Sequence, residues 1–317
     1  MSAALPPTLQ QLLDRRLAVL RQAHPDLDDA LSLQHAIIST QLAAPRPPEL
    51  SAFPLPRQQV VARLEEGVPL LHEQPAAVDL HFAADLFSRL LNALLERETA
   101  SATDSPNTGA EPLIAAATTG RLDPESLFGE AFVQHTDHIG QIAHAADLEP
   151  DRLSAVATWA VAPILRAYAS RLQPLLAQAD AVWERGYCPI CGGWPLLAEM
   201  PEGERAPSLR CAACASAWAV QRPMCPYCGN TDAQTTLKTL TLDGQARFHA
   251  LLCDRCTGYL KAGRTFESPP AELLAVDDVA SLHLDLAAIE RGYRRPPGSG
   301  YRIELAVPDD EWLEEVV

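Results

Sequence analysis

The chain has 317 residues, enough for two or three domains, and its 47% hydrophobic content supports a sizeable core. Its formal net charge of −16 excludes an overall basic surface, so we expect it to repel nucleic-acid phosphates and anionic membranes. No stretch approaches about 18 uninterrupted apolar residues, so the sequence predicts no membrane-spanning helix and no direct membrane insertion.

The N-terminal stretch MSAALPPTLQQLLDRR predicts a cytoplasmic protein that begins with a helix. It has no basic segment followed by an apolar run, so it does not look like a secretory signal. Thr8 follows two prolines and is suited to cap the first helix. One face of this helix carries the apolar residues Leu9, Leu12, Leu13, Leu17 and Leu20.

Helical periodicity continues as far as residue 180. Further amphipathic segments cover residues 27–42, 78–97, 123–148 and 151–179. A polar linker rich in turn formers, residues 98–112, follows the second of them. Pro163 lies inside the last segment, where a proline removes a backbone donor and so predicts a kink or a break.

From residue 181 the pattern changes to short β-rich runs. These are SAWAV at 216–220, TTLKTLTL at 235–242, RFHALL at 247–252 and YLKAGRTF at 259–266. Residues 181–270 carry nine basic and eight acidic side chains, a net charge of +1, so this segment differs electrically from the acidic remainder. Helical periodicity then returns in residues 271–293, with Asp277 or Asp278 as the expected N-cap.

All eight cysteines lie in the β-rich segment, and each belongs to a Cys-x-x-Cys pair. A tetrahedral metal site needs four thiolates at about 2.3 Å from the ion, and one Cys-x-x-Cys turn supplies two of them. The glycine after CPIC and after CPYC favours such a turn, because glycine adopts positive φ without strain. The sequence therefore predicts two four-thiolate metal sites, with the ligands Cys188, Cys191, Cys211, Cys214, Cys225, Cys228, Cys253 and Cys256.

The pairs alternate in type, which predicts a tandem repeat of one small ribbon. The first and third are Cys-Pro-x-Cys-Gly, whereas the second and fourth are CAAC and CDRC. We expect sequential pairing, first with second and third with fourth, while crossed pairing of first with third remains the alternative. Four-thiolate coordination suits zinc and iron alike, so the residues leave the metal open.

These sites allow several functions. Purely structural metals are one, because a ribbon this small cannot bury enough core to fold alone. A small electron carrier is possible if the metal is iron, and a nucleic-acid-binding zinc ribbon is possible despite the low basic charge. Thioredoxin-like redox chemistry is disfavoured, since it uses a single Cys-x-x-Cys within a βαβ pattern. Four thiolates leave no open coordination position, so we expect no enzyme.

Several other side chains allow either a functional or a purely structural interpretation. His135 and His138 stand at i, i+3 and could support a metal, although a polar helix face is the simpler interpretation. Arg210 and Arg222 lie next to cysteines, where they could offset thiolate charge, contact an acidic partner or be ordinary surface residues.

With the cysteines in this arrangement, residues 186–293 resemble the formate dehydrogenase accessory protein FdhE family. The resemblance rests on CPICG, LRCAACASAW, RPMCPYCGN, LLCDRCTGYLK and AVDDVASLHLDLAAIERGY, in this order. The N-terminal part matches only in length, helicity and a GVPLL segment. RRPPGSGYRI at 294–303 departs from the family ending, so no role is transferred to it.

The resemblance implies a function and a partner. It implies a cytoplasmic assembly factor for respiratory formate dehydrogenase that binds the catalytic subunit before export. It also implies rubredoxin-like iron at the eight cysteines, and it leaves the oligomeric state open.

The expected fold is multidomain, mostly α with a small β part. An all-α helical domain covers residues 1–180, and tandem rubredoxin-like or zinc-ribbon-like metal knuckles cover residues 181–270. A C-terminal helix and an acidic tail cover residues 271–317.

Overall fold

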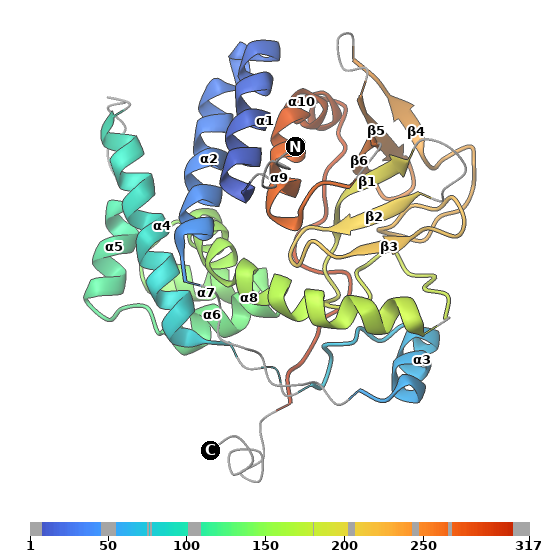
Figure 1. Ribbon diagram of the computed structural model, residues 1–317, viewed down its shortest axis with the longest axis horizontal. Helices are drawn as coiled ribbons and strands as arrows, with labels where there is room; N and C mark the ends of the chain where they lie inside the picture. The colour runs from blue at the N-terminus through green and yellow to red at the C-terminus, as the bar shows by residue number, and fades with distance from the viewer. Residues whose placement is uncertain are drawn as a thin grey trace, which may run out of the picture.

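The computed structural model describes residues 8–45, 55–74, 76, 78–100, 109–179, 181–201, 207–242, 247–265 and 268–306 (Figure 1). The predicted acidic tail at 307–317 and the centre of the predicted linker, 101–108, lie outside the described residues.

Two helices near the N-terminus, α1 (Leu9–Ala23) and α2 (Asp28–Ala43), lie side by side (Figure 1). A short 3₁₀ turn, Pro25–Leu27, connects them. The predicted cap of α1 is confirmed: the Thr8 hydroxyl accepts from the Gln11 backbone N–H, and the Gln11 side chain accepts from the Thr8 backbone N–H. This reciprocal pair satisfies two of the donors left free at a helix start.

The remaining helices before the β-rich segment build most of the core. They are α3 (Arg57–Glu66), α4 (Leu80–Ala100), α5 (Glu111–Thr118), α6 (Pro124–Phe132), α7 (Thr136–Ala145) and α8 (Pro150–Gln178). Of the kink or break predicted at Pro163, the break is wrong, because α8 runs through that residue without interruption, and the kink stays a prediction. Its flanking residues Ala160, Val161, Ile164 and Leu165 are buried, so packing along both turns holds the helix despite the missing donor.

One six-stranded sheet contains both ribbons, in the order β3-β2-β1-β6-β5-β4. The strands are β1 (Pro195–Pro201), β2 (Ser208–Cys211), β3 (Ala217–Ala219), β4 (Lys238–Leu240), β5 (Phe248–Cys253) and β6 (Gly258–Thr265). Neighbours within each ribbon are antiparallel, whereas β1 and β6 are parallel and join the two ribbons at the centre. The sequence did not predict β1 and β2, although the other four strands coincide with the predicted β-rich runs.

The C-terminal helical segment is divided in two. After a 3₁₀ turn at Ala271–Leu273 come α9 (Leu274–Ala280) and α10 (Leu282–Glu290), which are separated at Ser281. The N-cap prediction for Asp277 and Asp278 is wrong, since both residues lie inside α9. Their carboxylates instead pair with cations from distant parts of the chain.

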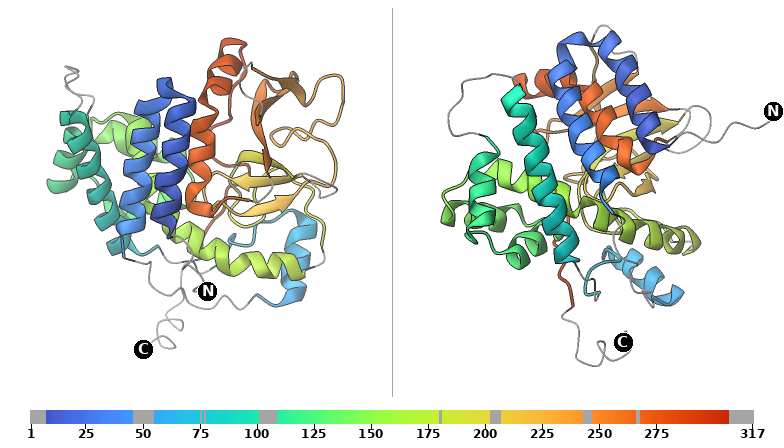
Figure 2. Two further views of the ribbon diagram at one scale, coloured as in Figure 1. Left: turned by 45° about the horizontal axis from the view of Figure 1, so that its top comes forward. Right: turned by 60° about the vertical axis from the view of Figure 1, so that its left-hand side comes forward.

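Helices α9 and α10 lie between the α1–α2 pair and the sheet (Figures 1 and 2). Val276 of α9 belongs to one buried apolar cluster with Leu13 and Leu17 of α1, while Leu284 of α10 belongs to another with Phe248 and Ala250 of β5. A mostly α protein with a small mixed sheet is therefore confirmed. The predicted domain boundaries stay a prediction, and the largest core cluster contains side chains from the helices and from the first ribbon.

Within the described residues, no helix combines the length and the apolar character needed to span a membrane.

Candidate metal centres

The eight cysteines form two groups of four, and each group gathers its sulfur atoms in one place. We call Cys188, Cys191, Cys211 and Cys214 the first centre, and Cys225, Cys228, Cys253 and Cys256 the second centre. The grouping is sequential, as expected, and the crossed alternative does not occur. All eight thiols are free rather than joined in disulfides.

The distances between sulfur atoms suit a tetrahedral metal. With metal–sulfur bonds of about 2.3 Å, neighbouring sulfurs are roughly 3.8 Å apart. In the first centre the Sγ atom of Cys191 lies 3.5 Å from those of Cys211 and Cys214, and the Sγ atoms of Cys188 and Cys214 are 3.7 Å apart. In the second centre the Sγ pairs Cys225–Cys256 and Cys228–Cys253 are 3.7 and 3.8 Å apart. Each group could therefore hold one metal ion.

All four Cys-x-x-Cys turns share one backbone conformation. The residue four positions after the first cysteine of each pair has positive φ, from 54° to 75°: Gly192, Ala215, Gly229 and Thr257. Two of these residues are the predicted glycines. Alanine and threonine in the other two positions adopt a conformation that glycine enters more easily, which indicates that the surrounding turn imposes it.

The turns also share a hydrogen-bond pattern. In the first turn, the Cys188 N–H donates to the carbonyl of Gly193, and the Gly192 N–H donates to the carbonyl of Cys188. The third turn repeats both bonds with Cys225, Asn230 and Gly229. The tandem repeat predicted from the cysteine spacing is thus visible in the backbone.

Three distant segments enclose the first centre. The N–H groups of Leu70 and Leu71, in the GVPLL segment, donate to the carbonyls of Pro189 and Ile190 at 2.8 and 2.9 Å. From the other end of the chain, the N–H groups of Gly300 and Tyr301 donate to the carbonyl of Gly192.

The third segment is the loop before α7. The Gln134 side-chain amide donates to the carbonyl of Cys191 at 3.1 Å. The sequence did not predict any of these three contacts. The resemblance of the GVPLL segment was a signal for the contact that Leu70 and Leu71 make.

The two centres differ in exposure. Every cysteine of the first centre is buried, and the Ser216 hydroxyl lies 3.0 Å from the Sγ atoms of Cys188 and Cys214. In the second centre, Cys228 and Cys256 are only half-buried. Solvent therefore reaches the second centre and not the first.

The electrostatics of the first centre favour a cation. Burial opposes ionisation of Cys188, but hydrogen bonds with the other thiols and with Ser216 outweigh it and bring the pKa of Cys188 well below the usual range. The hydrogen bonds of Cys191 with its neighbouring thiols raise its pKa, and burial raises the pKa of Cys211. The protein alone thus stabilises one thiolate and disfavours others, so a full set of thiolates requires a bound cation.

In the second centre the pKa values of the cysteines also shift in opposite directions. Burial raises the pKa of Cys256 to about 11. Burial also opposes ionisation of Cys253, but the Thr236 side chain and the N–H groups of Arg255 and Cys256 lower its pKa to about 6. The donor sets of both centres fit a divalent four-thiolate ion, and the assignment of the eight cysteines as ligands stays a prediction.

A chelator is expected to remove metal from the second centre before the first, because only the second has half-buried cysteines. Release from protein loaded with two equivalents of zinc should show two phases of one equivalent each, followed with a coloured chelator. In Cys228→Ser the fast phase should be absent and the slow one retained. A single phase of two equivalents would contradict this difference between the centres.

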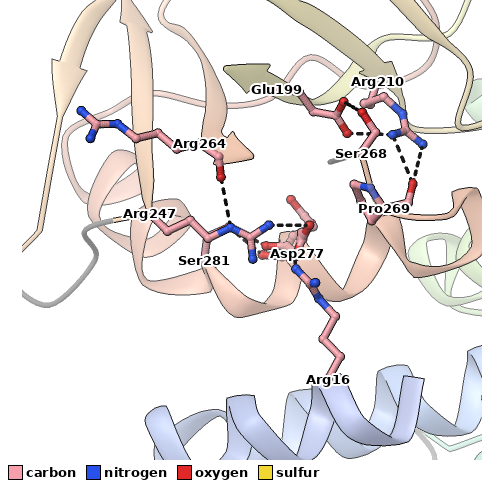
Figure 3. A network of polar contacts seen from close by, with 10 residues as sticks. Arg16, Glu199, Arg210, Arg247, Arg264, Ser268, Pro269, Asp277 and Ser281 are labelled. Atoms are coloured by element: carbon pink, nitrogen blue, oxygen red, sulfur yellow. Dashed lines mark hydrogen bonds and ion pairs between the residues drawn. The ribbon is translucent and has the colours of Figure 1, made fainter. Parts of the chain in front are cut away.

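Arg210 has a structural role. It differs from both functional roles expected from the sequence, offsetting thiolate charge and contacting an acidic partner. It is buried and ion-paired with Glu199 at 2.7 Å, and Ser268 donates to the same carboxylate (Figure 3). Its Nε donates to the carbonyl of Ala215, the strained residue of the second turn. Arg210 therefore stabilises the second turn through the backbone carbonyl of Ala215 and not through the thiolates.

Comparisons with known proteins point to one family. Residues 209–299 match the family model described as FdhE, C-terminal domain. The Protein FdhE of Escherichia coli O127:H6 (strain E2348/69 / EPEC) is 35% identical over 140 residues, 43% of this chain and 44% of that protein. The Protein FdhE of Escherichia coli (strain K12 / DH10B) is 34% identical over 140 residues with the same coverage. The chain thus matches less than half the length of these curated relatives.

A solved structure extends the likeness beyond that segment. The crystal structure of the FdhE protein from Pseudomonas aeruginosa has a TM-score of 0.51 and 25% sequence identity to this chain. The alignment covers 94% of this chain and 98% of the other, so the similarity of fold includes the N-terminal helices.

Proposed function

We propose, from the premise that this chain is a relative of the FdhE proteins, that it is an accessory factor for the maturation of respiratory formate dehydrogenase. The resemblance predicted from the cysteine motifs is confirmed by the family model, the curated relatives and the solved structure. The observation that carries the proposal is the pair of four-cysteine groups with tetrahedral sulfur spacing within the region of that resemblance.

In the proposed role, the chain binds the catalytic subunit of formate dehydrogenase in the cytoplasm, before the subunit is exported. The role is one of binding and not of turnover, because four thiolates would occupy every position of a tetrahedral ion. Iron, which the family resemblance implies, or zinc would occupy both centres. Iron held by four thiolates can accept and donate one electron, whereas zinc cannot.

In this proposal the two centres have different roles. The first centre lies within the largest core cluster, next to side chains of the helices, so its metal would hold the helices and the first ribbon together. The second centre has solvent-accessible cysteines, so its metal would be the one that a partner or a reductant can reach.

The proposal is tested by an anaerobic pull-down from host cytosol with the full chain as bait. We expect mass spectrometry to identify a catalytic subunit of formate dehydrogenase, and we expect lower recovery with Cys228→Ser. The control variant is His144→Ala, an exposed change on α7 outside both centres. Recovery of RNA polymerase or ribosomal components in place of that subunit would instead support the nucleic-acid-binding alternative.

The half-buried second centre also supports a second candidate, a small iron electron carrier. That function requires visible absorbance from ferric thiolate that a reductant bleaches reversibly. A colourless protein that contains zinc in both centres, isolated without air, would eliminate it and leave the accessory role intact.

A further inference from the structure

A group of metal-ligating side chains outside the two cysteine centres lies where α6 ends and α7 begins. The Glu130 carboxylate projects from α6, His135 precedes α7, and His138 lies in its first turn. The Oε2 atom of Glu130 is 2.8 Å from Nδ1 of His135 and 3.2 Å from Nδ1 of His138. The three ligand atoms all lie within 4.8 Å of one another.

The backbone brings these side chains together. Gln134 has a φ of 62°, in the left-handed region, and so turns the chain sharply between the two helices. The His135 N–H donates to the carbonyl of Glu130 at 2.9 Å, which fixes the first histidine beside the carboxylate. The i, i+3 spacing then places His138 on the same face of the helix. The sequence identified the histidine pair as a possible metal site, and the structure places the Glu130 carboxylate beside it.

The charge of this group is suited to a cation. In the described part of the chain, the only basic side chains within 4.0 Å of the Glu130 carboxylate are His135 and His138, so no lysine or arginine neutralises it there. Asp137 and Arg302 both line the cavity of about 160 Å³ that His135 also lines, so one acidic and one basic side chain lie near the group. Two imidazoles and one carboxylate form a donor set that divalent transition ions prefer.

The distances need only a small adjustment. A tetrahedral ion with bonds of about 2.0–2.2 Å requires donor atoms roughly 3.3–3.6 Å apart. The observed separations of 2.8 and 3.2 Å are shorter than this by roughly 0.5–0.8 and 0.1–0.4 Å, and the side chains of Glu130 and His138 are 29% and 47% exposed. Side chains with this much freedom can separate without disturbing the core.

One further atom lacks a partner in the present arrangement. Nε2 of His135 is buried and forms no hydrogen bond with any residue that the structure describes. When Nδ1 binds a metal, Nε2 carries the proton and needs an acceptor. The cavity that His135 lines is large enough for a water molecule in this position.

We propose that Glu130, His135 and His138 form a third metal site, which binds a divalent transition ion through one carboxylate oxygen and two imidazole nitrogens. Three protein ligands leave at least one coordination position open, in contrast to the cysteine centres. The site adjoins the first centre, because Gln134, between its two helices, donates to the carbonyl of Cys191.

The test uses Co²⁺ as the probe on full-length protein that already contains zinc in both cysteine centres. We expect one further equivalent of Co²⁺ to bind, with visible d–d bands and without the intense charge-transfer bands of cobalt–thiolate bonds. His138→Ala should weaken this binding by more than about 100-fold, beyond the loss typical of outer-shell changes. Glu130→Gln should weaken it as well.

The matched control is His144→Ala, which removes an exposed histidine from the same helix and should leave Co²⁺ binding unchanged. Circular dichroism and retention of two zinc ions establish that each variant is folded. Binding of no third equivalent, or equal binding to His138→Ala and the parent protein, would overturn the proposal and leave a hydrogen-bonded cluster only. Neither result depends on formate dehydrogenase, so the proposed function is tested separately.

Discussion

Cys188→Ser is expected to remove the metal of the first centre and to unfold a large part of the molecule. Cys188 is fully buried, and its centre belongs to the same core cluster as side chains of α4, α6, α7 and α8. Binding of a structural zinc supplies about 10–16 kcal/mol in small metal-dependent domains. That is as large as the whole stability of a typical domain, about 5–15 kcal/mol. Metal analysis combined with thermal unfolding followed by near-ultraviolet circular dichroism measures the effect.

The comparison variant is Cys228→Ser, which replaces a half-buried cysteine of the second centre by the same residue. It should lose one metal equivalent while the helices retain their thermal transition. Equal metal content in Cys188→Ser and the parent protein, with the same unfolding temperature, would show that the first centre does not hold the core.

Asp285→Ala is expected to destabilise the protein by about 3–5 kcal/mol, the usual result of removing one partner of a buried ion pair. Lys261 is fully buried in β6, and its ammonium group pairs with Asp278 and Asp285. Tyr259 also donates to Asp285 at 2.8 Å, and Arg295 pairs with it at 3.0 Å. Without this carboxylate, two cations share Asp278 alone.

Denaturant unfolding at neutral pH measures this loss as a lower midpoint. The control is Asp26→Ala, which removes an exposed contact between Asp26 and His283 and should lower the midpoint far less than Asp285→Ala does. Adding Lys261→Met to Asp285→Ala should recover part of the loss, since the buried charge that lost its partner is removed as well. An equal midpoint for Asp285→Ala and Asp26→Ala would contradict the role assigned to the buried pair.

The features that depend on local sequence were predictable. The cap at Thr8, the helices and the sequential grouping of the cysteines follow from spacing and residue type, which act over a few positions. The glycines after CPIC and CPYC predicted the left-handed turns for the same reason. Ala215 and Thr257 adopt that conformation without such a signal, because the ribbon around them imposes it.

The features that depend on distant partners were not predictable. Asp277 looks like a helix cap, yet its carboxylate binds Arg16 of α1 and lies 3.4 Å from Arg247, which precedes β5 (Figure 3). Strand β1 carries two prolines and a mixed pattern, and it forms because β2 and β6 lie on either side of it. The sequence did not predict that Glu130 contacts the two histidines, because that contact depends on the turn at Gln134.

Residues near the C-terminus, which are synthesised last, cover part of the first centre, and this order has a consequence for biosynthesis. The carbonyl of Gly192 is covered by the N–H groups of Gly300 and Tyr301. Gly300 is 108 positions further along the chain than Gly192. A ribosome that adds about 5–20 residues per second synthesises the intervening stretch in roughly 5–20 s. For most of that interval, from Cys214 onward, all four cysteines of the first centre have been made while the cover from Gly300 and Tyr301 has not. We therefore expect metal to enter the first centre more readily on the nascent chain, and protein completed in metal-starved cells to load this centre slowly when metal is added later.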